Sequence, residues 1–164
     1  MSDLLSSVEV TIDTSAVGPY LQERTTAIRV ALAEKMTAVS TMLQSKIVGD
    51  KLSGQLLNRR SGKLSDSVRV EAVVATETEI DGGVTAGGGP VNYAAALEDG
   101  AKAHVIMPKN AKALAFMIDG KQIFAMRVNH PGNRAYSYMK GTLTENADTI
   151  RGEFQDAASE AAQS

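Results

Sequence analysis

The chain has 164 residues, of which 43% are hydrophobic and 22% charged, so its length and composition fit one compact domain rather than a disordered chain. It has no apolar run near the roughly 20 residues that cross a bilayer and no secretory signal, so we expect synthesis in the cytoplasm and no membrane contact. A net charge of -2, few aromatic residues and no cysteine argue against a general nucleic-acid-binding module and exclude disulfides, thiolate zinc sites and cysteine nucleophiles.

The N-terminal third predicts one long amphipathic helix. Residues 1–15 are loosely specified, although Val8, Val10 and Ile12 alternate as in an arm or an edge strand. Apolar residues then recur at three- and four-residue steps over residues 19–48, which predicts a helix about 45 Å long. A helix of this length in so short a chain must lie along most of a sheet or reach into a neighbouring molecule.

The middle of the chain, residues 68–128, predicts a mostly antiparallel sheet region. Residues 63–67 predict a short helical turn, 68–75 a half-buried strand, and 79–86 its hairpin partner, which Gly82 and Gly83 interrupt. Residues 91–99 predict a short helix. Strands are expected over 104–107, 113–118 and 122–128, with Asp119 and Gly120 forming a tight turn between the last two.

The C-terminal part predicts a second helix and then a loose end. Helical spacing over residues 134–155 is followed by 156–164, which lack apolar residues larger than Ala and are expected to be flexible. The whole chain is therefore predicted to be a single α+β domain, in which the two long helices pack on a small antiparallel sheet.

No group of residues predicts an enzyme, a cofactor site or a metal site. His104 and His130 lie too far apart in sequence for common metal-site spacing, and no carboxylate pair or serine elbow stands out. Carboxylates such as Glu98 are better interpreted as caps and turn residues. The stretch Asn58-Arg59-Arg60-Ser61-Gly62-Lys63 can contact phosphates, but we favour an exposed loop that meets acidic groups of another subunit.

Several segments resemble one family in their order and spacing. The segments are Arg60-Ser61-Gly62-Lys63-Leu64, then Tyr93-Ala94-Ala95-Ala96-Leu97-Glu98-Asp99-Gly100, then residues 104–114, 120–124 and Val128-Asn129-His130-Pro131-Gly132. Together they resemble the neck or tail-completion family of long-tailed bacteriophages, over residues 59–143. Where that family commonly carries an Arg-Pro-Phe type segment, this chain has Asn133 to Tyr138, so the choice between neck, completion and terminator subunit stays open.

The resemblance implies a structural virion protein without catalytic activity. Its expected partners are copies of itself in a six-fold or twelve-fold ring, other neck, connector and tail proteins, and genomic DNA passing through the lumen. The residues expected at interfaces are Arg59, Arg60, Lys63, Tyr93, Glu98, Lys109, Lys112, His130, Arg134, Tyr136 and Tyr138. Three alternatives remain: a tail terminator or tail-tube subunit, a small nucleic-acid-binding protein, and a hydrolase.

Overall fold

One long helix forms the spine of the molecule. The computed structural model describes residue 15 and residues 17–54, 56–57 and 61–163. Helix α1 spans Val17–Lys46 and continues into a π-helical turn, η1, over Ile47–Lys51. This confirms the predicted N-terminal helix, which begins slightly earlier and ends in a wider turn. Apart from residue 15, the arm or edge strand predicted for residues 1–15 lies outside the described residues.

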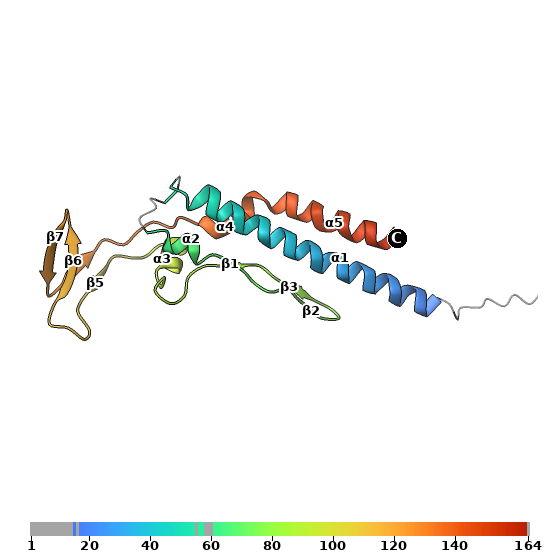
Figure 1. The fold of residues 1–164 in the computed structure, drawn as a ribbon, viewed down its shortest axis with the longest axis horizontal. Coiled ribbons are helices and arrows are strands. Elements are labelled where there is room, and N and C mark those ends of the chain that lie inside the picture. The colour runs from blue at the N-terminus through green and yellow to red at the C-terminus, as the bar shows by residue number, and fades with distance from the viewer. Residues whose placement is uncertain (1–14, 16, 55, 58–60, 164) are drawn as a thin grey trace, which may run out of the picture.

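Two C-terminal helices, rather than one, follow the strands. Helix α4 spans Tyr138–Glu145 and helix α5 spans Ala147–Gln163, and α5 runs back along α1 in the opposite direction (Figure 1). An ion pair of 2.6 Å between Lys35 Nζ and Glu153 Oε2 joins these two long helices. The predicted C-terminal helix is confirmed, but it begins at Tyr138 rather than at residue 134, is divided between α4 and α5, and continues to Gln163 through residues predicted to be a flexible end.

The physical reasons for these differences lie in contacts distant in sequence. Residues before α4 are held extended because the N–H groups of Tyr136 and Ser137 donate to the carbonyls of Leu97 and Glu98. The end of α5 stays helical because alanine is the best helix former and its small side chain permits close packing. The alanines that line the seam between α1 and α5 are Ala31, Ala38, Ala157 and Ala161.

A narrow antiparallel ribbon runs beside α1. It contains α2 (Lys63–Asp66), then strands β1 (Arg69–Val70) and β2 (Val74–Ala75), and returns through β3 (Ile80–Asp81) and β4 (Val84–Thr85). The strands pair β1 with β4 and β2 with β3, so each predicted strand is split in two. A Cβ atom at Gly82 would lie 2.6 Å from Met36 Cγ, which shows how closely the ribbon approaches the helix at this break.

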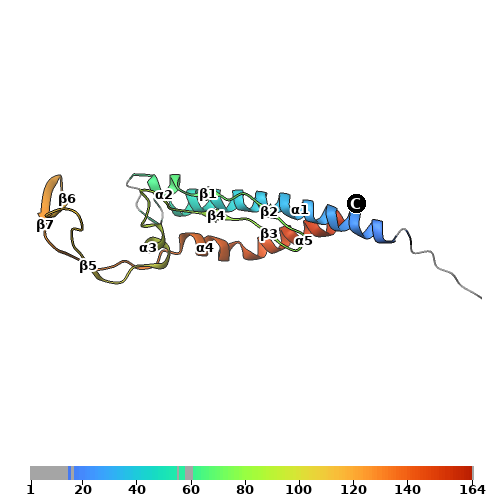
Figure 2. The same ribbon diagram turned by 90° about the horizontal axis from the view of Figure 1, so that it is seen from below.

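A long arm projects from the end of the molecule opposite the N-terminus of α1. After α3 (Ala94–Asp99), strand β5 (His104–Ile106) pairs with β8 (Val128–His130), and β6 (Leu114–Ile118) pairs with β7 (Lys121–Ala125) at the tip. Figures 1 and 2 show this arm extending clear of the helices. The predicted tight turn is confirmed, since Asp119 and Gly120 both have positive φ, as a two-residue hairpin of this type requires.

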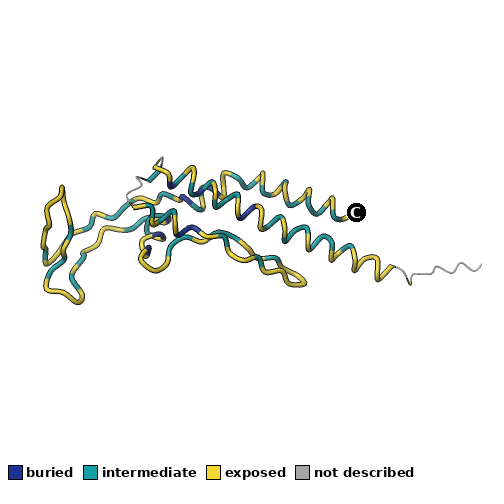
Figure 3. The backbone as a smooth tube through the Cα atoms, in the orientation of Figure 1, coloured by how far each residue is buried: buried dark blue, intermediate teal, exposed yellow. Residues whose placement is uncertain are grey.

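The fold belongs to the predicted α+β class, but its strands form four separate two-stranded sheets rather than one. Its core is small and lies where the arm meets the helices. The fully buried cluster consists of Ile47, Leu52, Val68 and Tyr138. Figure 3 shows that most of the remaining chain is exposed or only half-buried. The accessible surface of 12366 Å² compares with about 7800 Å² expected for a compact monomer of this mass.

Candidate functional site

The projecting arm, residues 101–133, carries an unusual amount of exposed apolar surface. Its tip hairpin and the adjoining turns expose Phe124 by 67%, Met126 by 72% and Met117 by 63%. The other large apolar side chains exposed on the arm are Val105, Met107, Ile118 and Ile123. Single exposed apolar residues are normal on a protein surface, but a concentration of this kind marks an interaction site.

The β6–β7 hairpin is apolar on both faces. Cross-strand partners share a face, so Phe116 and Ile123 lie on one side while Ala115 and Phe124 lie on the other. The sheet has only these two strands, so the outer edge of each leaves backbone N–H and C=O groups without a strand partner. An isolated hairpin is at best marginally stable in water. The tip therefore presents apolar side chains on both faces and open strand edges.

The arm is also basic. It carries one acidic residue, Asp119, and the five cationic residues Lys102, Lys109, Lys112, Lys121 and Arg127. All five cationic residues are exposed. Lys109 and Lys112, both expected at an interface, lie in the loop between β5 and β6. The arm therefore combines apolar contact area with a positive field that attracts acidic surfaces.

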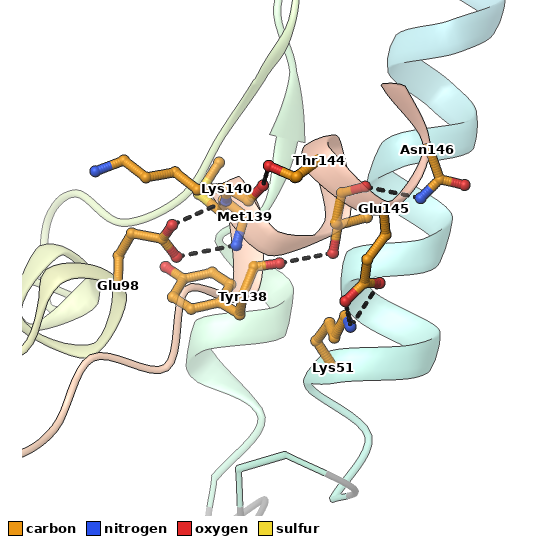
Figure 4. A network of polar contacts seen from close by, with 9 residues as sticks. Lys51, Glu98, Tyr138, Met139, Lys140, Thr144, Glu145 and Asn146 are labelled. Carbon is orange, nitrogen blue, oxygen red and sulfur yellow. Dashed lines mark hydrogen bonds and ion pairs between the residues drawn. The ribbon is translucent and has the colours of Figure 1, made fainter. Parts of the chain in front are cut away.

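A buried carboxylate fastens the arm to the body. Glu98, at the end of α3, is only 7% exposed, and its two oxygens accept the backbone N–H groups of Met139 and Lys140 at 2.9 and 2.8 Å (Figure 4). These N–H groups belong to the first turn of α4, where a helix has free donors and a partial positive charge. Ser137, the residue before α4, makes no side-chain cap. Glu98 therefore caps a helix that follows the arm.

Tyr138 is the centre of this joint. Its side chain is 1% exposed, and burial, with the nearby carboxylate of Glu98 as a second cause, raises the pKa of its phenol to about 12. The hydroxyl of the buried Thr142 donates to the Tyr138 carbonyl at 2.7 Å. Lys51 Nζ binds both carboxylate oxygens of Glu145 at 2.8 Å, joining η1 to α4 (Figure 4). The buried polar side-chain atoms described in this region, where α3, α4 and η1 meet and which we call the mount of the arm, all have hydrogen-bond partners.

The two histidines meet at the base of the arm. His104 and His130 are paired across β5 and β8, and their rings stack with centroids 5.0 Å apart. Nδ1 of His130 accepts the N–H of Gly132 at 3.0 Å, which requires the unprotonated form of that nitrogen. Sequence spacing could not reveal this pair, because the two residues come together only through the strand register. In the part of the chain that the structure describes, no third acidic, His or Cys side chain joins them to form a metal-binding group.

The other residues expected at an interface lie in different places. Arg59 and Arg60 lie outside the described residues. Lys63 is exposed at the start of α2, and Tyr93 is exposed just before α3. Arg134 lies over the ring of Tyr136 at 5.1 Å, close to where the chain returns from the arm.

Of the expected residues, Lys109 and Lys112 lie exposed on the arm. Glu98 and Tyr138 are instead buried within the chain where α3 meets α4, so the prediction that they form an interface is wrong, because both serve internal packing and capping. Sequence reasoning missed the exposed apolar side chains of the tip. Their signal was present, because residues 113–118 and 123–126 are apolar at successive positions rather than alternating with polar ones.

None of the helices that the structure describes is both long and apolar enough to cross a membrane. No known family model, curated protein or solved structure matches the chain.

Proposed function

We propose that this chain is a structural subunit of the head–tail connection of a long-tailed bacteriophage, a neck or tail-completion protein that assembles through its arm. The observation that carries the proposal is the β6–β7 hairpin, which is apolar on both faces and is held away from the body on its mount. Such a surface suits assembly and needs no catalytic chemistry.

Two further features support an assembled protein. The accessible surface far exceeds that of a compact monomer, and it contains open strand edges and apolar side chains that association would cover. The segments that resemble the neck family extend over α2, α3, the arm and α4. The resemblance and the candidate site thus occupy the same part of the chain, and by resemblance the assembly is a ring of six or twelve copies in the virion.

The first experiment measures the mass of the purified protein by light scattering and its ability to join phage heads and tails that lack it. We expect a ring, or restored joining. The variant Phe124→Ser should lose both, whereas Val30→Ser, which changes an exposed apolar residue on α1, should retain them. A strict monomer that attaches to neither particle would refute the proposal.

A second candidate function, nucleic-acid binding, is favoured by the exposed cationic residues of the arm. In a neck protein, the same cationic residues would also suit contact with DNA in the lumen. This function predicts a DNA affinity that falls steeply with salt and that the double variant Lys109→Gln/Lys112→Gln reduces. The affinity of Phe124→Ser should then be almost unchanged. Assembly through the hairpin predicts the opposite sensitivity, with Phe124→Ser the more damaging change.

A further inference from the structure

An apolar groove lies at the end of the molecule opposite the arm. Its volume is about 460 Å³, and its walls are α1, the turn between β2 and β3, and α5. Apolar side chains from all three walls form its lining: Ile28, Leu32, Met36, Ile80 and Phe154. One guanidinium N–H of Arg29 donates to the Glu77 carbonyl at 3.0 Å, which holds the turn against the helix.

The elements around this groove are mainly acidic. Among the residues that line it, Glu77 and Glu79 are acidic and Arg29 of α1 is cationic. The ribbon over residues 69–86 carries one cationic residue, Arg69, and the acidic residues Glu71, Glu77, Glu79 and Asp81. Helix α5 carries one cationic residue, Arg151, and the acidic residues Asp148, Glu153, Asp156 and Glu160. The groove therefore has the opposite charge to the arm, while both are apolar at their centres.

We propose that the β6–β7 hairpin of one copy docks into this groove on a second copy, with Phe124 entering between α1 and the β2–β3 turn. This inference rests on the proposed function, because it specifies how the subunits associate. The arm and groove complement each other in apolar character and in charge. They lie at opposite ends of one molecule (Figures 1 and 2), so an arm cannot reach its own groove.

A contact between two different surfaces of identical chains is heterologous, and its repetition closes into a ring when the rotation allows. A two-fold contact between two hairpins would instead stop at a dimer. The arm-to-groove contact therefore accounts for a closed ring with a single kind of interface. The same contact covers both the apolar tip of the arm and the groove beside α1.

Engineered cysteines provide a direct test, because the chain has none of its own. Gln122→Cys and Thr78→Cys place one thiol on the hairpin, on the same face as Phe124, and one at the groove, and both positions are exposed. These substitutions keep Phe124 itself. Mixing the two single variants in the assembled protein and oxidising should give cross-linked dimers that contain one chain of each. The double variant should give a ladder of covalent oligomers. Thr78→Cys alone, and Gln122→Cys mixed with Ser45→Cys, should give almost none.

The outcomes separate this inference from the proposed function. If the protein assembles or joins particles, and Gln122→Cys cross-links only to itself, the contact is two-fold and the inference is wrong while the function stands. The inference is also wrong, and the function stands, if Gln122→Cys captures another phage protein rather than a second copy. If the protein neither self-associates nor attaches to heads or tails, the proposed function itself fails.

Charge reversal gives an independent check. Glu79→Lys should weaken self-association at least 10-fold, and adding Lys121→Glu should recover part of that loss if the two residues face each other across the contact. An increase of salt from 50 to 500 mM should weaken the unmodified assembly. Equal association of the single and unmodified forms at low salt would contradict the docking we propose.

Discussion

Replacing Glu98 with Ala should weaken the contact between α3 and α4, at the base of the arm, without changing the arm itself. The substitution removes two charge-assisted hydrogen bonds, of 2.8 and 2.9 Å, to the N–H groups of Lys140 and Met139. Each such bond contributes about 1.5–3 kcal/mol, and the loss is partly offset because a carboxylate no longer has to be buried. A free energy of unfolding lower by about 2–4 kcal/mol is expected, a large share of the 5–15 kcal/mol typical of a domain.

Urea denaturation measured by circular dichroism tests this value, with Asp99→Ala as the matched control. Asp99 is the next residue and binds Lys140 Nζ at 2.6 Å, but both side chains of that ion pair are well exposed. Exposed pairs contribute little, so the control should change stability by less than about 1 kcal/mol. Glu98→Gln should fall between the two, since its amide offers one acceptor oxygen. Equal stabilities of Glu98→Ala and Asp99→Ala would refute the capping role.

Three further predictions concern the mount and the tip. Gly132→Ala should destabilise the protein by about 3 kcal/mol or more, because Gly132 has a φ of +84° and a Cβ there would collide with the Ala101 carbonyl. Thermal denaturation measures this loss, and Gly120→Ala is the control. Gly120 also has a positive φ but has open space around it, so the comparison separates the clash from the backbone strain. Because folding keeps the Tyr138 phenol neutral and raises its pKa to about 12 from 10, its contribution is complete below pH 10 and declines by about 2–3 kcal/mol as the pH rises to 12. Tyr138→Phe should lack this part of the alkaline loss, and identical pH profiles for the two proteins would contradict the burial argument. Phe124→Ser should lower association but leave the urea midpoint of the monomer unchanged, because the ring is exposed within one chain. A lower midpoint would show that Phe124 stabilises the monomer instead.

Sequence patterns predicted correctly those elements that are determined by residues close together in the sequence. The recurrence of apolar residues along α1 and the Asp119-Gly120 turn each depend on neighbours in sequence, and both are present as expected. The predicted bounds of the C-terminal helix were wrong at both ends, for opposite reasons. Its start is displaced because Tyr136 and Ser137 pair with a segment almost 40 residues earlier, and its end is ordered by packing on α1.

The candidate site was predicted only in outline. Lys109 and Lys112 belong to the exposed arm, as an interface requires. Glu98 was expected at an interface and was grouped with the other carboxylates as a cap, turn or solvated residue, so neither its burial nor the helix that it caps was predicted. The stacked histidines and the two-sided apolar hairpin depend on strand register, which a single sequence specifies weakly when neither face has a clear polar pattern. The arm could therefore be recognised as strands, but its separation from the body could not.

The way in which the arm is attached determines how it would carry mechanical load. Both of its strands enter from the body at adjacent points, where Ala101 and Asn133 exchange two backbone hydrogen bonds of 2.9 Å. A pull on the tip along the arm stretches both strands equally, so it neither slides β5 past β8 nor unzips them. The tension reaches the body through Gly100 and Arg134, next to the helix that Glu98 caps. A load applied to the tip is therefore passed to α3 and α4 rather than to the pairing of β5 with β8.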